Sequence, residues 1–237
     1  MGHPRMTTVI VLHGGPGAPG DVDDLAFGLA DAFTVLAPHQ RPSGGAPLTV
    51  ARHVEDLREL LATRGLHRPA LVGSSWGAML ALAFAAAYPD LAGPLVLIGC
   101  GTFDEGARAQ FRAAIGGRKP GEAMRLYYYD PFPALPEPPV FDERANAETW
   151  ADMLRLQKEG VYPAAFAAIH GPVLMLHGAA DPHPGRMILA SLRPCLPQVE
   201  YREWERCGHY PWREKAVRDE FFATLKTWLG KQRSSNL

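Results

Sequence analysis

The chain has 237 residues, of which 47% are hydrophobic and 21% charged, and its net charge is −1. This length suffices to bury the core of one large domain, with room for a small insertion. A nearly neutral chain lacks the basic excess that binds nucleic acid or an anionic membrane, so we expect neither as a partner.

The hydrophobic run near the N-terminus covers only residues 8–12, which is too short for the core of a signal peptide or for a membrane span. Residues 78–87 are also too few to cross a bilayer. The three cysteines, Cys100, Cys195 and Cys207, are an odd number without metal-type spacing. Free thiols are typical of a reducing compartment, so we expect a cytoplasmic protein with no metal and no cofactor.

Short hydrophobic runs alternate with helical patterns along most of the chain. The predicted strands are residues 7–12, 34–37, 70–72, 94–98, 172–176 and 199–204. The predicted helices are residues 21–31, 49–64, 76–88, 185–192 and 214–229. This alternation predicts an α/β fold with a mostly parallel central sheet and helices on both faces.

Residues 102–170 interrupt this alternation. They contain three consecutive tyrosines at 127–129, the proline-rich stretch PFPALPEPP, and weak helical patterns at 105–115 and 143–158. We interpret this segment as a helical lid inserted over one edge of the sheet. The remaining residues, 1–101 and 171–237, would form the core domain.

A candidate nucleophile lies in the stretch LVGSSWGAML, between a predicted strand and a predicted helix. The pattern G-x-S-x-G there places its central serine on a sharp turn, where the hydroxyl projects above the carboxyl end of the sheet. Small residues on both sides let the strand and the helix pass closely. This register selects Ser75 rather than Ser74, and a serine needs a base to become a nucleophile.

His209 is the strongest candidate base among nine histidines. It follows the last predicted strand in a glycine-containing loop, CGHYP, and it comes after Ser75 in the chain, as this class of site requires. His177 and His13 also follow strands, but each precedes a glycine and is more typical of a residue that organises a turn. His53 lies among charged residues on a predicted helix, so we expect it at the surface.

The orienting acid should follow another strand and lie between the serine and the histidine in sequence. Asp181, in HGAADP, meets both conditions, and Asp104 after the strand at 94–98 is the alternative. A carboxylate in this position fixes the tautomer of the imidazole. Ser75, Asp181 and His209 would then form a catalytic triad.

The loop HGGPG, residues 13–17, is the candidate oxyanion hole. Its glycines allow the backbone to approach a substrate closely, and the amide of Trp76, directly after the serine, would supply the second donor. The loop fits a phosphate cradle less well. Neither phosphate-binding glycine pattern is present, and Pro16 removes one amide donor.

Together the four stretches HGGPG, GSSWG, HGAADP and GCGHYP resemble the α/β-hydrolase fold, in particular its proline iminopeptidase-like branch. The resemblance implies Ser75, Asp181 and His209 as the triad, with Gly15 and Trp76 in the oxyanion hole. The sequence departs from the branch in having HQRP at residues 39–42, where relatives commonly have DQRG. It also has a shorter lid, and it has no room for the two antiparallel strands that open the fold in most relatives.

These observations predict a serine hydrolase that cleaves a small ester, thioester or amide as its acyl substrate. Aromatic residues of the predicted lid, among them Tyr127, Tyr128 and Phe132, would line a hydrophobic pocket together with Trp76. An aminopeptidase that releases N-terminal proline is the alternative enzyme. A catalytically silent relative that binds a ligand in the same pocket is the alternative of another class. The sequence leaves the oligomeric state and the natural substrate open.

Overall fold

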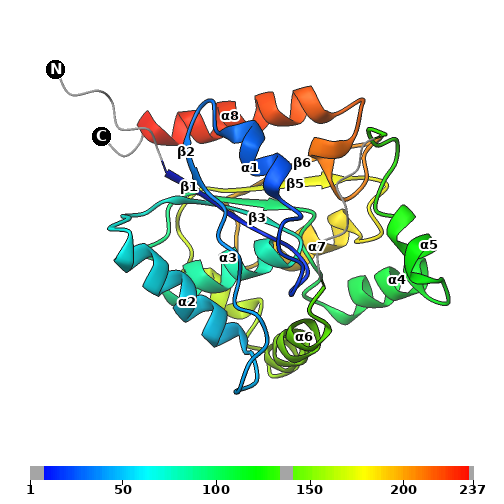
Figure 1. The fold of residues 1–237 in the computed structure, drawn as a ribbon, viewed down its shortest axis with the longest axis horizontal. Coiled ribbons are helices and arrows are strands. Elements are labelled where there is room, and N and C mark those ends of the chain that lie inside the picture. The colour runs from blue at the N-terminus through cyan, green and yellow to red at the C-terminus, as the bar shows by residue number, and fades with distance from the viewer. Residues whose placement is uncertain (1–7, 134–140, 235–237) are drawn as a thin grey trace.

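Six parallel strands form a single sheet in a computed structural model that describes residues 8–133 and 141–234 (Figure 1). The strand order is β2-β1-β3-β4-β5-β6, and every neighbouring pair is parallel. The strands are β1 (Thr8–Leu12), β2 (Thr34–Leu36), β3 (Ala70–Ser74), β4 (Leu95–Ile98), β5 (Val173–Gly178) and β6 (Val199–Trp204). The predicted parallel sheet is confirmed.

Helices cover both faces of this sheet, as predicted. One face packs against α1 (Asp23–Leu29) and α8 (Arg218–Ser234), and the other packs against α2 (Val50–Thr63), α3 (Trp76–Ala87) and α7 (Gly185–Leu192) (Figure 1). The last helix begins later than the sequence suggests, because residues 211–213 form the short 3₁₀-helix η2 before it.

The two cores arise from the alternation of side chains along the strands. In β1, Val9 and Val11 pack toward α1 and α8, whereas Ile10 and Leu12 pack toward α2 and α3. Successive side chains of a strand point to opposite faces, so a sheet covered on both sides needs hydrophobic residues at every position. Helix α3 is buried nearly all round and fixes the middle of the sheet.

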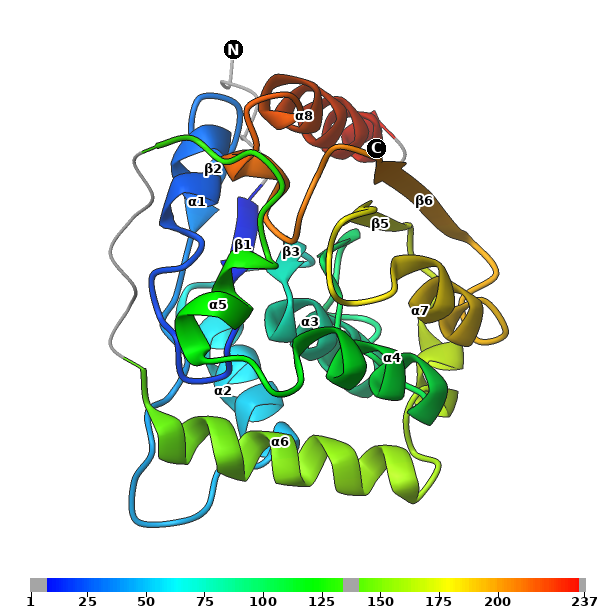
Figure 2. The ribbon, with the colours of Figure 1, turned by 90° about the vertical axis from the view of Figure 1, so that its right-hand side faces the viewer.

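The connection between β4 and β5, residues 99–172, carries α4 (Glu105–Ile115), α5 (Pro120–Arg125), α6 (Glu143–Lys158) and the 3₁₀-helix η1 (Ala164–Ala168). Figure 2 looks onto the carboxyl ends of the strands and shows α4 and α5 in front of α3, with α6 along the lower side. Helix α5 has no counterpart in the sequence prediction. Whether residues 102–170 behave as a separate lid stays a prediction.

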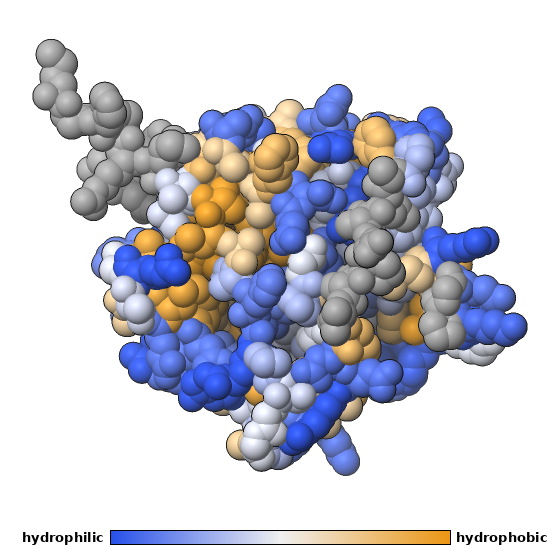
Figure 3. Space-filling view, viewed as in Figure 1, coloured by the Kyte–Doolittle hydropathy of each residue, from blue (hydrophilic) through white to orange (hydrophobic). Residues whose placement is uncertain are grey.

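Strand β2 is one edge of the sheet, and hydrophobic surface gathers near it, between β2 and α2 on the left of Figure 3. A cavity there lies between residues 38–42 and α2, with a volume of about 550 Å³. None of the helices in the described residues is both long and hydrophobic enough to span a membrane. Cys100, Cys195 and Cys207 are free thiols in the described structure.

Candidate active site

Ser75 occupies the sharp turn between β3 and α3. Its backbone has φ 54° and ψ −118°, a region that L-residues rarely adopt and that costs about 1–3 kcal/mol. Packing holds the turn in place: a Cβ on Gly73 would overlap the carbonyl of Gly77, and a Cβ on Gly77 would overlap the carbonyl of Leu12. The Ser75 amide also donates to the Ile98 carbonyl at 2.8 Å. The sequence therefore folds this serine into a strained and fixed position.

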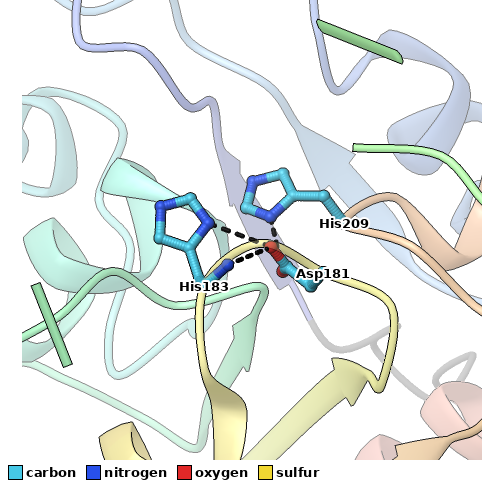
Figure 4. Close-up of side chains that lie close together, drawn as sticks. All are labelled: Asp181, His183 and His209. Carbon is cyan, nitrogen blue, oxygen red and sulfur yellow. Dashed lines mark hydrogen bonds and ion pairs between the residues drawn. The ribbon is translucent and has the colours of Figure 1, made fainter. Parts of the chain in front are cut away.

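Asp181 and His209 meet above the carboxyl end of the sheet (Figure 4). Asp181 follows β5 and His209 lies in the loop after β6. The Nδ1 of His209 lies 2.6 Å from Oδ2 of Asp181, and both side chains are buried. Because an ionised carboxylate only accepts hydrogen bonds, the proton sits on Nδ1 and the Nε2 of a neutral ring is left as a base.

Two further histidines surround the same carboxylate. His183 donates to Oδ1 of Asp181 from its backbone amide at 2.9 Å and from Nδ1 at 3.0 Å. The Nε2 of His177 lies 3.0 Å from the His183 carbonyl and 3.2 Å from Oδ2 of Asp181. The turn-organising role predicted for His177 agrees with these contacts. The sequence reasoning missed His183, although it stands two residues after the candidate acid.

The charge state of this cluster follows from its contacts. Burial alone would raise the pKa of Asp181, but His209, His183 and His177 outweigh that effect and hold the pKa well below its ordinary value. Burial lowers the pKa of His183, although Asp181 partly offsets this. One ionised carboxylate with imidazole donors around it is therefore the stable arrangement near neutral pH.

These three side chains do not form a convincing metal site. Ligand-type atoms of Asp181, His183 and His209 lie within 4.8 Å of one another. A metal ion binds imidazole in the plane of the ring, yet the rings of His183 and His209 are stacked, with centroids 4.9 Å apart and 28° between their planes. Both Nδ1 atoms face the carboxylate (Figure 4). The geometry fits hydrogen bonds to one acceptor better than shared coordination of an ion.

The loop that carries His209 is anchored by a buried glutamate that the sequence analysis placed at the start of a helix. Glu214 accepts backbone hydrogen bonds from Gly208 at 3.0 Å, Tyr129 at 2.8 Å and Asp130 at 2.7 Å. The His209 amide in turn donates to the Tyr127 carbonyl at 2.8 Å. The chain after α5 is thereby tied to the histidine loop.

The glycine-rich loop after β1 lies beside Ser75. Both oxygens of Asp21 accept the Gly14 amide, at 3.2 and 3.1 Å. Burial raises the pKa of Asp21 to about 6, although the Gly14 hydrogen bond partly counteracts it. The Gly15 amide has no acceptor within residues 8–133 and 141–234. Trp76 begins α3, so its amide has no acceptor in its own helix. Gly15 and Trp76 therefore have free backbone amides in the described structure, and their role in an oxyanion hole stays a prediction.

His13 organises this loop, as its position suggested. The Gln40 amide donates to Nε2 of His13 at 2.9 Å, so Nδ1 carries the proton and donates to the Gly14 carbonyl at 2.9 Å. The Gln40 side chain donates to the His13 carbonyl at 2.8 Å and accepts from Nε1 of Trp76 at 2.7 Å. Gln40, part of the HQRP departure, therefore links the loop to the nucleophile turn.

The expectation that His53 lies at the surface is wrong. His53 is buried, its Nε2 lies 3.0 Å from the Thr149 hydroxyl of α6, and its ring packs edge-on against Trp76 with centroids 5.8 Å apart. Burial lowers the pKa of His53 to about 4. Helix α6 covers the side of α2 that carries this histidine.

Ser75 opens into a cavity of about 310 Å³ beneath α4 and α6. Its other lining residues are Gly15, Thr102, Arg108, Phe111, Arg112, Tyr127, Trp150, Leu154 and His183. Of the four aromatic residues predicted for the pocket, Tyr127 lines this cavity in the described structure. Tyr128, Phe132 and the fully buried Trp76 do not. Tyr128 packs against Tyr210, and Phe132, a residue that is 37% exposed, lies beside Arg218. The alternative acid, Asp104, caps α4 by accepting the Ala107 amide at 2.8 Å.

Residues 9–224 match the model of the alpha/beta hydrolase family, and the chain belongs to that family. A curated relative from Paraburkholderia phymatum, a 2-hydroxy-6-oxononadienedioate/2-hydroxy-6-oxononatrienedioate hydrolase, is 29% identical over 94% of this chain and 87% of its own length. The proline iminopeptidase of Neisseria gonorrhoeae is 28% identical over 71% of this chain. This chain spans 62% of that enzyme's length.

Solved structures show the same fold. A thermophilic esterase from Thermogutta terrifontis superposes with a TM-score of 0.71 and 20% identity, over 96% of this chain and 91% of the esterase. The proline iminopeptidase of Mycobacterium smegmatis superposes with a TM-score of 0.69 and 21% identity, over 99% and 93% of the two chains. The family and its hydrolase relatives identify the chain as an alpha/beta hydrolase enzyme.

Proposed function

We propose that the protein is a serine hydrolase that cleaves a small ester, thioester or amide through an acyl-enzyme on Ser75. The observation that carries this proposal is the 2.6 Å hydrogen bond from His209 to Asp181, at the same sheet end as the strained Ser75 turn. It leaves Nε2 of His209 free to act as the base. Ser75 lines the cavity that would receive the substrate.

In this mechanism the Ser75 oxygen forms a bond to the substrate's carbonyl carbon while its proton passes to Nε2 of His209. The amides of Gly15 and Trp76 stabilise the negative oxygen that develops. The bond to the leaving group then breaks, and the leaving group takes the proton from His209. Water repeats the two steps, releases the acid and restores the serine. Asp181 keeps the ring oriented and stabilises its charged form.

A fluorophosphonate probe tests the nucleophile directly. It should label the wild-type protein and the Ser74→Ala variant, and it should not label Ser75→Ala. Ser74 is a matched control because it is the neighbouring serine, fully buried in β3. If the folded wild type stayed unlabelled, the protein would instead be the ligand-binding relative.

The aminopeptidase remains the second candidate because of the similarity to proline iminopeptidases. Short-chain nitrophenyl esters compared with prolyl arylamides decide between the two activities. We expect the esters to be preferred, because no Asp or Glu is among the residues that line the cavity in the described structure, and such a group would bind a substrate's free amino terminus. The named substrates of the Paraburkholderia relative are dioates, so carboxylate-bearing compounds belong in the same panel.

A further inference from the structure

The wall of the Ser75 cavity carries permanent positive charge. Arg108 and Arg112 of α4 line it, and no carboxylate does so among the described lining residues. The neighbouring His183 adds no charge near neutral pH, because burial lowers its pKa. Guanidinium groups remain charged at all pH values that a folded protein tolerates. Among the residues that line the cavity, permanent charge is therefore confined to the two arginines on the α4 side.

Arg108 is held in place by α6. Its side chain is only 19% exposed, and it donates to Gln157 of α6. Gln157 is fixed in turn, because its amide donates to the carbonyl of the cavity residue Thr102 at 3.0 Å. A pre-positioned guanidinium loses little side-chain freedom when it binds a ligand, which favours recognition over simple solvation.

Glu105 is the acidic group that competes for these arginines. It lies 2.9 Å from Arg108 and also pairs with Arg112, but its side chain is 67% exposed and outside the cavity lining. One exposed carboxylate shared by two arginines leaves a net positive charge on this wall. Exposed pairs of this kind are weak, and a ligand in the cavity can replace them.

We propose that Arg108, assisted by Arg112 at the cavity wall, binds a carboxylate on the substrate, so that the natural substrate is an anionic acyl compound. This inference rests on the proposed hydrolase function and specifies its substrate class. An arginine and a carboxylate can form two parallel hydrogen bonds, which adds orientation to attraction. The anionic group would bind at α4 while the reacting carbonyl lies at Ser75.

Two pairs of esters test the proposal and locate the anion. The first pair, 4-nitrophenyl hydrogen glutarate and 4-nitrophenyl pentanoate, differs by a carboxylate on the acyl part. The second pair, 4-acetoxybenzoate and 4-acetoxybenzamide, differs by a carboxylate on the leaving group. In at least one pair, kcat/KM should favour the anion by about tenfold, the size of one charge-assisted hydrogen bond. Equal or lower kcat/KM for the anion in both pairs overturns the proposal.

Variants of α4 assign the preference to its residues. Arg108→Gln should lower the anion-to-neutral ratio of kcat/KM about tenfold, whereas Glu105→Gln should raise it, because the competing carboxylate is gone. Arg144→Gln is the matched control: this exposed arginine of α6 pairs with Glu148 and does not line the cavity, so the ratio should not change. If Arg108→Gln left the anion-to-neutral ratio of kcat/KM unchanged, the proposal would also be overturned.

A binding measurement keeps this test independent of turnover. Monomethyl glutarate should bind Ser75→Ala with about tenfold higher affinity than methyl pentanoate, and the added substitution Arg108→Gln should abolish that difference. If the wild type hydrolysed neither ester of either pair, the proposed function would fail, and this binding difference would still decide whether the anion site exists.

Discussion

Two buried aspartates border the site, Asp21 after β1 and Asp181 after β5, and their surroundings act on them in opposite directions. Asp181 has three imidazoles around it, and its pKa lies well below its ordinary value despite complete burial. Among the described residues, Asp21 has one backbone amide as the hydrogen-bond donor to its side chain, and burial raises its pKa to about 6. Burial alone therefore does not set the charge of a carboxyl group; the number and kind of donors that face it do.

The largest effect should come from replacing Asp181. Asp181→Asn removes the negative charge and allows the wrong tautomer of His209, so kcat should fall by about 10⁴-fold. Steady-state ester hydrolysis measures this. Asp104→Asn is the control, because asparagine also caps helices well and α4 should be preserved. The opposite result, with Asp104→Asn inactive and Asp181→Asn active, would move the orienting role to Asp104.

The second effect concerns how the free energy of unfolding depends on pH. Asp21 binds its proton more tightly when folded, so its contribution to stability is present below about pH 4 and is lost as pH rises through about 6. Relative to Asp21→Asn, the wild type should lose roughly 3 kcal/mol of unfolding free energy across this range. Asp181 behaves in the reverse sense: its contribution is present above pH 4 and is lost on acidification.

Denaturant titrations at pH 2, 3, 4, 5, 6 and 7 on wild type, Asp21→Asn and Asp181→Asn measure both slopes, because the contribution of Asp181 changes only below about pH 4 and that of Asp21 above it. The difference between wild type and each variant isolates one carboxyl group. If the stability difference between wild type and variant changed with pH in the same direction for both variants, the pKa values of Asp21 and Asp181 would be shifted in the same direction. That result would contradict the difference between the two aspartates.

The smallest effect concerns the donors around Asp181. His183→Phe keeps an aromatic ring next to Phe111, whose centroid lies 4.1 Å from that of His183, but it removes the Nδ1 donor to Asp181. One charge-assisted hydrogen bond is worth about 1.5 kcal/mol, so kcat should fall about tenfold. His183→Asn restores a donor and should recover part of the rate. An unchanged rate in His183→Phe would mean that the remaining contacts of Asp181, with His209, His177 and the backbone amide of residue 183, suffice to hold the carboxylate.

The fold could be predicted from sequence because its signal is local. Hydrophobic runs of strand length alternate with helical patterns, and this order predicts the parallel sheet that the structure confirms. The positions of Ser75, Asp181 and His209 at strand ends were also visible in short motifs. These signals depend on neighbours in the chain, so no tertiary contact was needed to recognise them.

What the sequence did not reveal depends on contacts between distant segments. His53 lies among charged residues of α2, and only the packing of α6 buries it against Thr149. Asp21 resembled the start of a helix, yet it turns back to bind Gly14. Arg108 belongs to a weakly amphipathic segment whose cavity-facing side is defined by Gln157 and Thr102. No pattern of neighbouring residues in the sequence predicts where these three side chains lie.

The two sides of the Ser75 cavity differ in how freely their residues can change. The turn that carries Ser75 is tightly packed, whereas α4 and α6 contribute only side chains. Because Gly73 and Gly77 leave no space for even one methyl group, Ser75 cannot move without opening the contacts between β1, β3 and α3. The residues of α4 and α6 that line the same cavity do so through their side chains. We therefore expect relatives with different substrates to differ in the cavity-lining residues of α4 and α6, and to keep the tightly packed turn around Ser75.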